Sequence, residues 1–115
     1  MSTILGAIVG DTIGSIYEFN STKEYDFPLL DSKMEFTDDT VMTIAVADWL
    51  LNDISLSHSG LCNRMRYWGK KYRWPMGSYG GRFSKWLDNS EMGPYNSWGN
   101  GSAMRVAPVG FAFET

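Results

Sequence analysis

The stretch FTDDTVMTIAVADWLL, residues 36–51, decides the fold class. Apolar residues recur in it at the spacing of one broad helical face, which predicts a helix over residues 38–51. The face includes Val41, Ile44, Ala45 and Trp49. Thr37 or Asp38 is the expected N-cap, because a short polar side chain there accepts a hydrogen bond from an unpaired N–H of the first turn.

Two adjacent carboxylates, Asp38 and Asp39, stand between Thr37 and Thr40 at the start of this helix. Helix capping and the favourable interaction of a carboxylate with the positive end of the helix dipole explain the presence of one acidic residue here. Two neighbouring carboxylates repel each other unless a positive group lies between them, and hard cations such as Mg²⁺ prefer oxygen ligands. The pattern therefore leaves two interpretations open, a capped helix or a cation site.

The rest of the chain also favours helices, and no alternating run is long enough to predict a sheet. Further helices are expected over residues 3–17, 58–72 and 82–87, and from Ser102 with an interruption at Pro108. Residues 20–35, 73–81 and 88–101 are expected to be loops. Gly6, Gly10 and Gly14 would lie along one face of the first helix, where tight helix packing is one explanation. The class is all-α.

The length of 115 residues predicts a single domain over residues 1–115. Cys62 is the only cysteine, so no internal disulfide can form, which fits a reducing compartment. The N-terminal 19 residues lack a basic leader, and Asp11 interrupts their apolar part. We therefore expect a cytoplasmic protein without a membrane span.

Charge is unevenly distributed along the chain. Residues 1–53 hold ten acids and two bases, whereas residues 54–87 hold seven bases and no acid. Bases interleaved with aromatic residues can bind single-stranded nucleic acid. The alternative is a solvated face over an aromatic core, and the acidic pI of about 5.0 makes nucleic acid an unlikely partner. His58 has no second histidine to form a zinc site with, and neither His58 nor Cys62 belongs to an evident nucleophilic triad.

A glycine-rich turn, SWGNG over residues 97–101, precedes the expected last helix. Glycines allow positive φ and close approach of a ligand to the backbone, and a helix N-terminus can receive phosphate. Arg105 can add positive charge. The pattern is compatible with a phosphate-binding turn and equally with an ordinary turn before a helix.

Three separated motifs resemble one known family, and a fourth matches its bacterial members. They are GAIVGDTIGSIYEF at 6–19, FTDDTVMTIAVADWL at 36–50, YNSWGNGSAMRVAPVGF at 95–111 and RWPMGSYGGRFSKWL at 73–87. In order and approximate spacing they are similar to the ADP-ribosylglycohydrolases, which include dinitrogenase-reductase-activating glycohydrolase and the ADP-ribosyl-acceptor hydrolases. The resemblance covers nearly the whole chain.

The resemblance implies a partial ADP-ribosylglycohydrolase-like helical bundle. It also implies hydrolysis of the glycosidic bond between ADP-ribose and a protein side chain, with a pair of Mg²⁺ or Mn²⁺ ions. By motif, Thr37, Asp38 and Asp39 resemble the metal ligands, with the two aspartates and Glu18 in catalytic positions. Asp11 would have a supporting role. The residues that would bind ADP-ribose are Ser97, Trp98, Gly99, Asn100 and Gly101.

Family members are longer and carry a second acidic motif of the Asp-x-Asp-Thr or Asp-x-Asp-Ser type near their C-terminus. This sequence ends at Thr115 without one. We therefore expect a truncated domain with exposed apolar surface, weak Mg²⁺ binding and little or no hydrolysis. A second copy or another chain would have to supply the missing ligands. The alternative is a non-catalytic protein-binding module, such as a phage-encoded inhibitor of a bacterial defence complex.

Overall fold

The computed structural model describes residues 2–113, and it confirms the all-α class. Within that range the chain forms α-helices, one short 3₁₀ helix and no strand. The elements are α1 (Ser2–Gly14), the 3₁₀ helix η1 (Ser15–Tyr17), α2 (Asp38–Asn52), α3 (His58–Lys71), α4 (Gly81–Asp88), α5 (Gly101–Met104) and α6 (Ala107–Ala112). None of these helices is both long and apolar enough to span a membrane.

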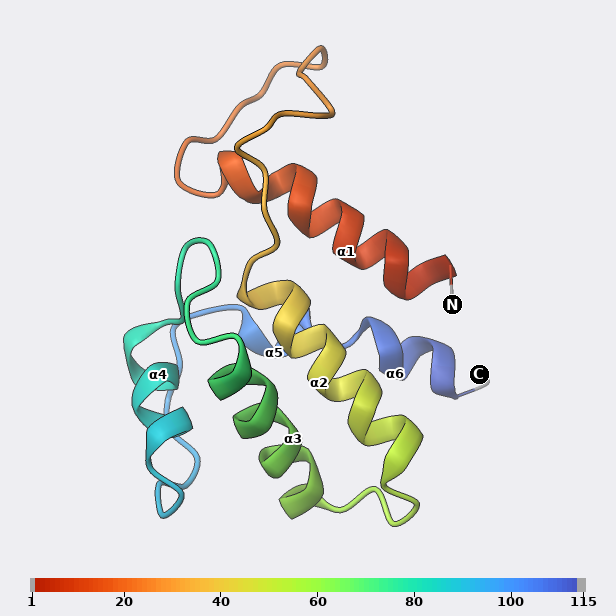
Figure 1. The fold of residues 1–115 in the computed structure, drawn as a ribbon, viewed down its shortest axis with the longest axis vertical. Coiled ribbons are helices and arrows are strands. Elements are labelled where there is room, and N and C mark those ends of the chain that lie inside the picture. Colours follow the sequence, from red (N-terminus) through yellow and green to blue (C-terminus); the bar gives the residue numbers. More distant parts are fainter. Residues whose placement is uncertain (1, 114–115) are drawn as a thin grey trace.

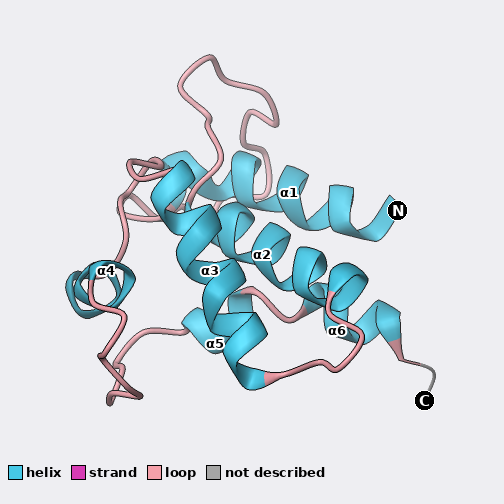
Figure 2. Ribbon diagram, turned by 60° about the horizontal axis from the view of Figure 1, so that its bottom comes forward, coloured by secondary structure: helices cyan, strands magenta, loops and turns pink. Residues whose placement is uncertain are grey.

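Helix α2 lies at the centre of the fold and contacts four other helices (Figure 1). Helix α3 packs along one side, α6 and α5 lie on another, and α1 crosses over the top, as the turned view also shows (Figure 2). This position follows from composition, because the residues of α2 that face its neighbours are apolar or small. Val41, Met42 and Ala45 are at most 2% exposed. The N-terminus of α2 is thereby held where α1, α5 and the loop before α4 meet.

The hydrophobic core lies between α2, α3 and α4. Its buried members are Val41, Met42, Ala45, Met65, Tyr79, Trp86 and Leu87. Two aromatic residues of the basic segment, Tyr79 and Trp86, therefore belong to the core, whereas Trp74 is 82% exposed. The basic segment thus combines a solvated face with an aromatic core beneath it.

The C-terminal helical segment is broken earlier than the sequence predicted. The interruption lies at Arg105 and Val106, between α5 and α6, and Pro108 occupies the first turn of α6. Proline is tolerated in a first helical turn, because the N–H that it lacks has no partner there. Pro108 therefore lies at the beginning of a new helix and does not end an existing one.

A substitution at Gly69 tests the packing of α3 against α4. A methyl group there would lie 2.6 Å from Leu87 Cδ2, which is too close, so the fully buried Leu87 side chain would have to shift. Overpacking costs roughly 1–3 kcal/mol, which exceeds the gain of about 1 kcal/mol in helix propensity. We expect Gly69→Ala to lower the free energy of urea unfolding by up to about 2 kcal/mol.

Gly6→Ala is the matched control for this substitution. A Cβ at Gly6 meets nothing within 4 Å, so only the propensity gain remains. The control is expected to leave the free energy of unfolding unchanged or to raise it by about 0.5–1 kcal/mol. Equal effects of the two alanines would contradict the described contact between Gly69 and Leu87.

Candidate metal and ligand site

Asp11 of α1 holds the first turn of α2 through four hydrogen bonds. Thr37 donates its backbone N–H to Asp11 Oδ2 (2.8 Å) and its hydroxyl to Oδ1 (2.5 Å). Thr40 donates its hydroxyl (2.6 Å) and its N–H (3.3 Å) to Oδ2. Both threonines that flank the acidic pair are therefore accounted for without a cation. The supporting role expected of Asp11 is a structural one, the docking of α1 onto α2.

Thr37 is the N-cap of α2. It is one of the two residues, Thr37 and Asp38, that the sequence predicted for this position. Its Oγ1 accepts a hydrogen bond from the Asp39 N–H at 3.2 Å. A hydroxyl has one proton and two lone pairs. Because the proton goes to Asp11 and one lone pair to Asp39, one lone pair remains for a further ligand. Capping and cation binding are therefore compatible at this residue.

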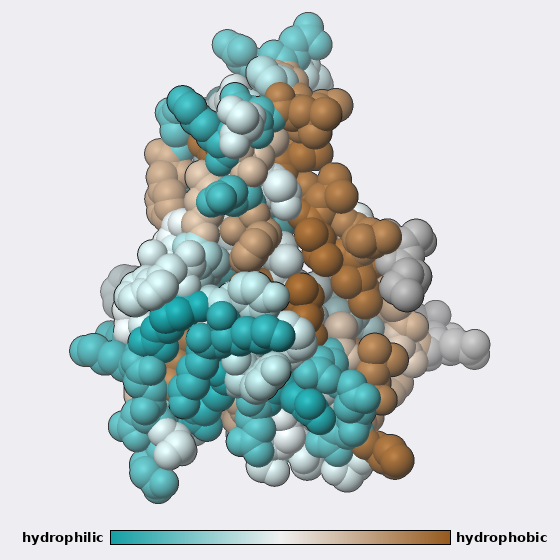
Figure 3. Space-filling view, in the orientation of Figure 1, coloured by the Kyte–Doolittle hydropathy of each residue, from teal (hydrophilic) through white to brown (hydrophobic). Residues whose placement is uncertain are grey.

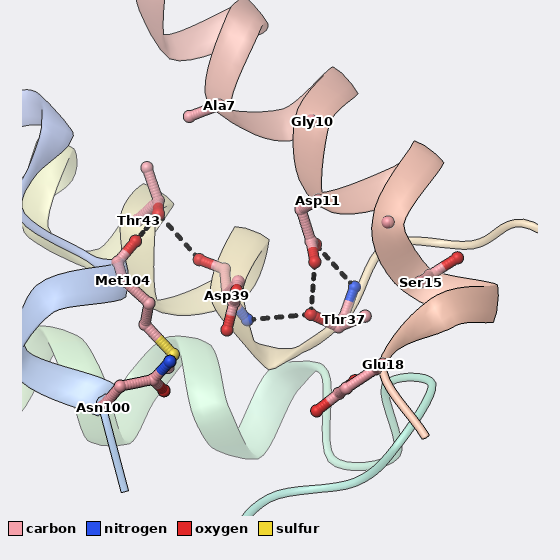
Figure 4. A pocket seen from close by; sticks show the side chains of 11 residues that line it. Ala7, Gly10, Asp11, Ser15, Glu18, Thr37, Asp39, Thr43, Asn100 and Met104 are labelled. Carbon is pink, nitrogen blue, oxygen red and sulfur yellow. Dashed lines mark hydrogen bonds between the residues drawn. The ribbon is translucent and has the colours of Figure 1, made fainter. Parts of the chain in front are cut away.

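A hollow of about 410 Å³, here named the acid hollow, opens beside this helix start (Figure 4). Three acids line it, from α1, from the end of η1 and from α2. The lining residues are Ala7, Gly10, Asp11, Gly14, Ser15, Glu18, Thr37, Asp39, Thr43, Asn100 and Met104. Of the predicted metal and catalytic residues, Glu18, Thr37 and Asp39 therefore share one cavity, and Asp38 is not among its lining residues.

The glycines of α1 do not serve tight packing between the described parts of the chain. A Cβ at Gly6, Gly10 or Gly14 would meet nothing within 4 Å. That interpretation of the stripe is wrong for residues 2–113, because no backbone approaches it there. Gly10 and Gly14 border the acid hollow instead, and their lack of side chains leaves its wall open.

The carboxylates at the acid hollow interact through their charges. Burial and the charge of Asp38 raise the pKa of Asp39 to about 6. The pKa of Asp38 is raised by burial and by Glu18, and that of Glu18 by burial and by Asp39. Burial and like charges both disfavour ionised carboxyls. A cation in the hollow would relieve both effects, so the electrostatics favour binding of a positive ion.

The donor chemistry fits Mg²⁺ or Mn²⁺, but the donor count is incomplete. Hydroxyl and carboxylate oxygens are suitable ligands for hard cations, and Mg²⁺ takes six of them. In residues 2–113 no three His, Cys, Asp or Glu side chains converge closely enough to hold a metal ion. Thr37 and Asp39, which line the acid hollow, could supply only part of a coordination shell, with water or other groups completing it.

The predicted ADP-ribose loop, residues 97–101, lies between the acid hollow and a second cavity. Asn100 lines the acid hollow, whereas Ser97, Gly99 and Gly101 border a cavity of about 350 Å³, here named the loop hollow, together with Arg105. Trp98 is 96% exposed and lines a neighbouring surface hollow. The structure thus brings the loop next to the predicted metal ligands.

The helix after this loop is shorter than the sequence predicted. Helix α5 has only four residues, so few peptide dipoles add up at its N-terminus. Any attraction for phosphate must therefore come from the loop N–H groups and from Arg105.

Comparison with known proteins identifies the family of this chain. The model of the ADP-ribosylglycohydrolase family matches residues 1–115. The chain belongs to the ADP-ribosylglycohydrolase family. Among its relatives is ADP-ribosylhydrolase ARH3 of Xenopus tropicalis, which is 28% identical over 136 aligned residues. The match covers 96% of this chain and 38% of that relative. No solved structure matches the chain.

One residue beside the acid hollow, Gly77, was not singled out from the sequence. Gly77 has a φ of +78°, and a Cβ on it would lie 3.1 Å from Glu18 Oε2. The turn that contains it is closed by a hydrogen bond from Ser78 N–H to Pro75 O, and Met76 forms a β-bridge with Thr37. The loop before α4 therefore abuts both Glu18 and Thr37. The glycine in the motif RWPMGSYGG indicates a turn, since glycine favours positive φ. The motif does not indicate that this turn contacts Glu18 and Thr37.

The raised pKa of Asp39 predicts how this member of the family responds to pH. A carboxyl whose folded pKa lies above its unfolded value of 3.8 binds protons more tightly when folded. Its stabilising contribution is present below about pH 4 and is lost as the pH rises through about 6. Because Asp39 is partly exposed, solvent screening reduces this contribution to about 1 kcal/mol.

We therefore expect Asp39→Asn to unfold with a weaker pH dependence than the unmodified chain. The free-energy difference between the two chains should change by about 1 kcal/mol between pH 4 and 7. Urea unfolding at each unit of pH measures this difference. A constant difference over that range would show that Asp39 is unperturbed in the folded chain.

Proposed function

We propose that this chain carries the amino-terminal metal-ligand set and the ADP-ribose loop of a site that hydrolyses ADP-ribosyl glycosidic bonds. The observation that carries the proposal is the convergence of Thr37, Asp39 and Glu18 on one acid hollow beside loop 97–101. Family membership supplies the reaction class, and the electrostatics of the hollow supply the preference for a cation.

Each residue has a chemical role in this proposal. Thr37, Asp38 and Asp39 would hold Mg²⁺ or Mn²⁺ through oxygen. The ion would contribute Lewis-acid stabilisation of developing charge and would orient ribose hydroxyls and water. Glu18 stands at the rim with a raised pKa, so it is suited to accept a proton from an attacking water. Asp11 keeps the Thr37 hydroxyl oriented by accepting its hydrogen bond.

Binding and turnover place different demands on the site. The loop and a loosely held ion are sufficient for binding ADP-ribose. We infer that turnover also requires oxygen ligands beyond Thr37, Asp38 and Asp39, from residues outside 2–113, a second copy or another polypeptide. The chain spans 38% of the length of the curated relative. Weak Mg²⁺ binding and little hydrolysis by this chain alone are the expected behaviour.

Calorimetric titration with ADP-ribose, with and without Mg²⁺, tests this function directly. We expect measurable binding that strengthens when Mg²⁺ is present, because the ion and the loop contact the same ligand. A parallel assay follows release of ADP-ribose from a modified peptide. Absence of any metal-dependent binding would refute the proposal. Turnover by the isolated chain, lost in the Asp38→Ala, Asp39→Ala double variant, would instead show that the site needs no further ligands.

A protein-binding role without catalysis is the second candidate, and the exposed apolar surface favours it. Figure 3 shows hydrophobic residues gathered along the side of the molecule where α1 lies. Leu5 and Val9 of α1 are 56% and 54% exposed. Ile8, Val9 and Leu30 are among the residues that line an apolar hollow of about 480 Å³. Light scattering would distinguish the candidates: a monomer whose behaviour is unchanged by Leu5→Ser with Val9→Ser would argue against this role.

A further inference from the structure

Arg105 occupies the boundary between the acid hollow and the loop hollow. Its neighbour Met104 lines the acid hollow, while Arg105 itself lines the loop hollow. The backbone here is tied to α2, because the Thr43 hydroxyl approaches Met104 O at 3.3 Å and Asp39 O at 2.7 Å. One residue of α2 therefore links the start of that helix to the end of α5. Arg105 follows directly and is held at a defined place relative to Asp38 and Asp39.

The side chain of Arg105 is fixed by neutral groups. Its Nε donates to Gly101 O, its Nη1 lies 3.8 Å from Met65 Sδ, and its guanidinium carbon is 5.3 Å from the centre of the Phe83 ring. A methyl group on Gly101 would lie only 2.5 Å from Nη2. Glycine at 101 is thus needed for the guanidinium to fold back over its own helix.

This guanidinium is partly buried and has no ion-pair partner in the described chain. The ion pairs of residues 2–113 join Arg64 to Asp48 and Arg73 to Asp88. Taking a cation out of water without pairing it is costly. Arg105 nevertheless lies close to the acidic pair, because Met104, directly before it, lines the acid hollow together with Asp39 and is tied to Asp39 through Thr43. Arg105 thus keeps an unpaired charge between two cavities despite the free-energy cost of desolvating it. We take this as an indication that the charge serves in ligand binding.

We propose that Arg105 is a positioning residue that couples the two hollows: it weakens cation binding at Asp38 and Asp39 and strengthens anion binding in the loop hollow. The inference rests on the proposed function and adds a determinant that the ligand motifs do not contain. Physically, a fixed positive charge repels the metal ion and attracts the phosphates of a ligand. The site then holds a bare cation loosely, and the affinity for cation and anion changes in opposite directions when this charge is removed.

The test uses Arg105→Gln, which removes the charge, and Arg105→Lys, which keeps it. Mn²⁺ affinity and metal-free ADP-ribose affinity are measured by calorimetry for each chain. We expect Arg105→Gln to bind Mn²⁺ roughly tenfold more tightly and ADP-ribose roughly tenfold more weakly. The lysine variant should keep its Mn²⁺ affinity within about twofold. Arg64→Gln, which changes net charge equally beside Asp48, is the matched control and should shift neither affinity by more than about twofold.

A purely structural role gives a different outcome, because a disordered site would lose affinity for both ligands. Weaker Mn²⁺ binding by Arg105→Gln, or unchanged affinities, would overturn the inference. Failure of the proposed function is seen separately, in the unmodified chain. If that chain binds no Mn²⁺ but Arg105→Gln does, the inference stands while the proposed function fails. If neither chain binds Mn²⁺, both are rejected.

Discussion

Replacing Asp11 with alanine is expected to lower the free energy of unfolding by about 3 kcal/mol, although Asp11 is a polar residue. The substitution removes all four hydrogen bonds to Thr37 and Thr40. Both threonines are buried, with exposures of 2% and 6%. The loss therefore includes the cost of leaving buried donors unpaired. Urea unfolding followed by tryptophan fluorescence measures it.

Two further variants show whether this loss comes from the described network. Asp31→Ala is the surface control, because Asp31 accepts a bond from the Lys33 N–H on an exposed loop. It should cost less than about 0.5 kcal/mol. Combining Asp11→Ala with Thr40→Val should cost less than the sum of the single changes, since both remove the bond from the Thr40 hydroxyl to Asp11. Additive losses would show that Asp11 does not stabilise the chain through Thr40.

Replacing Asp38 and Asp39 together with asparagine is expected to change binding and stability in opposite directions. Affinity for Mn²⁺ should fall more than about 100-fold, because two charged ligands are lost. The free energy of unfolding at pH 7 should rise by about 0.5–1 kcal/mol. Carboxylates gain a similar amount from the positive end of a helix dipole, but the raised pKa values show that burial and mutual repulsion outweigh that gain here.

The measurement combines calorimetry with urea unfolding at pH 7 and at pH 4. At pH 4 the Asp39 carboxyl is largely protonated in the folded chain, so the stability gain that comes from removing its charge should disappear. Asp26→Asn with Asp31→Asn is the matched control, because it removes the same charge from the exposed loop before α2. A double variant that loses stability while keeping its Mn²⁺ affinity would mean that the acidic pair serves only as a helix cap.

The fold followed from the sequence wherever local pattern determines structure. The apolar face of α2 and its threonine cap depend on residues close together in the chain, and their positions were predicted to within one residue. Local pattern failed at Pro108, because proline can either end a helix or begin one, and the preceding turn decides between them. It also failed at the glycines of α1, for which tight helix packing was one prediction. A helical face without side chains does not indicate which segment, if any, packs against it.

The candidate site was predictable in part for the same reason. Resemblance identified Thr37, Asp38, Asp39 and loop 97–101, because these residues form contiguous motifs. The partnership of Asp11 with Thr37 spans 26 residues and obeys no periodicity, so its extent was missed. Arg105 was noted as a source of charge, but its position between two cavities depends on how α5 packs against α2. Long-range placement of single polar groups is therefore what the sequence left open.

The hydrogen bonds from the first turn of α2 to Asp11 make two backbone amides reporters of an event elsewhere in the molecule. The N–H groups of Thr37 and Thr40 belong to the N-cap and the first turn of α2, but their acceptor belongs to α1. Their exchange with solvent deuterium is therefore controlled by detachment of α1, whereas amides in the middle of α2 exchange only when that helix opens. The rate of hydrogen exchange at these two amides therefore measures how often α1 detaches from the start of α2.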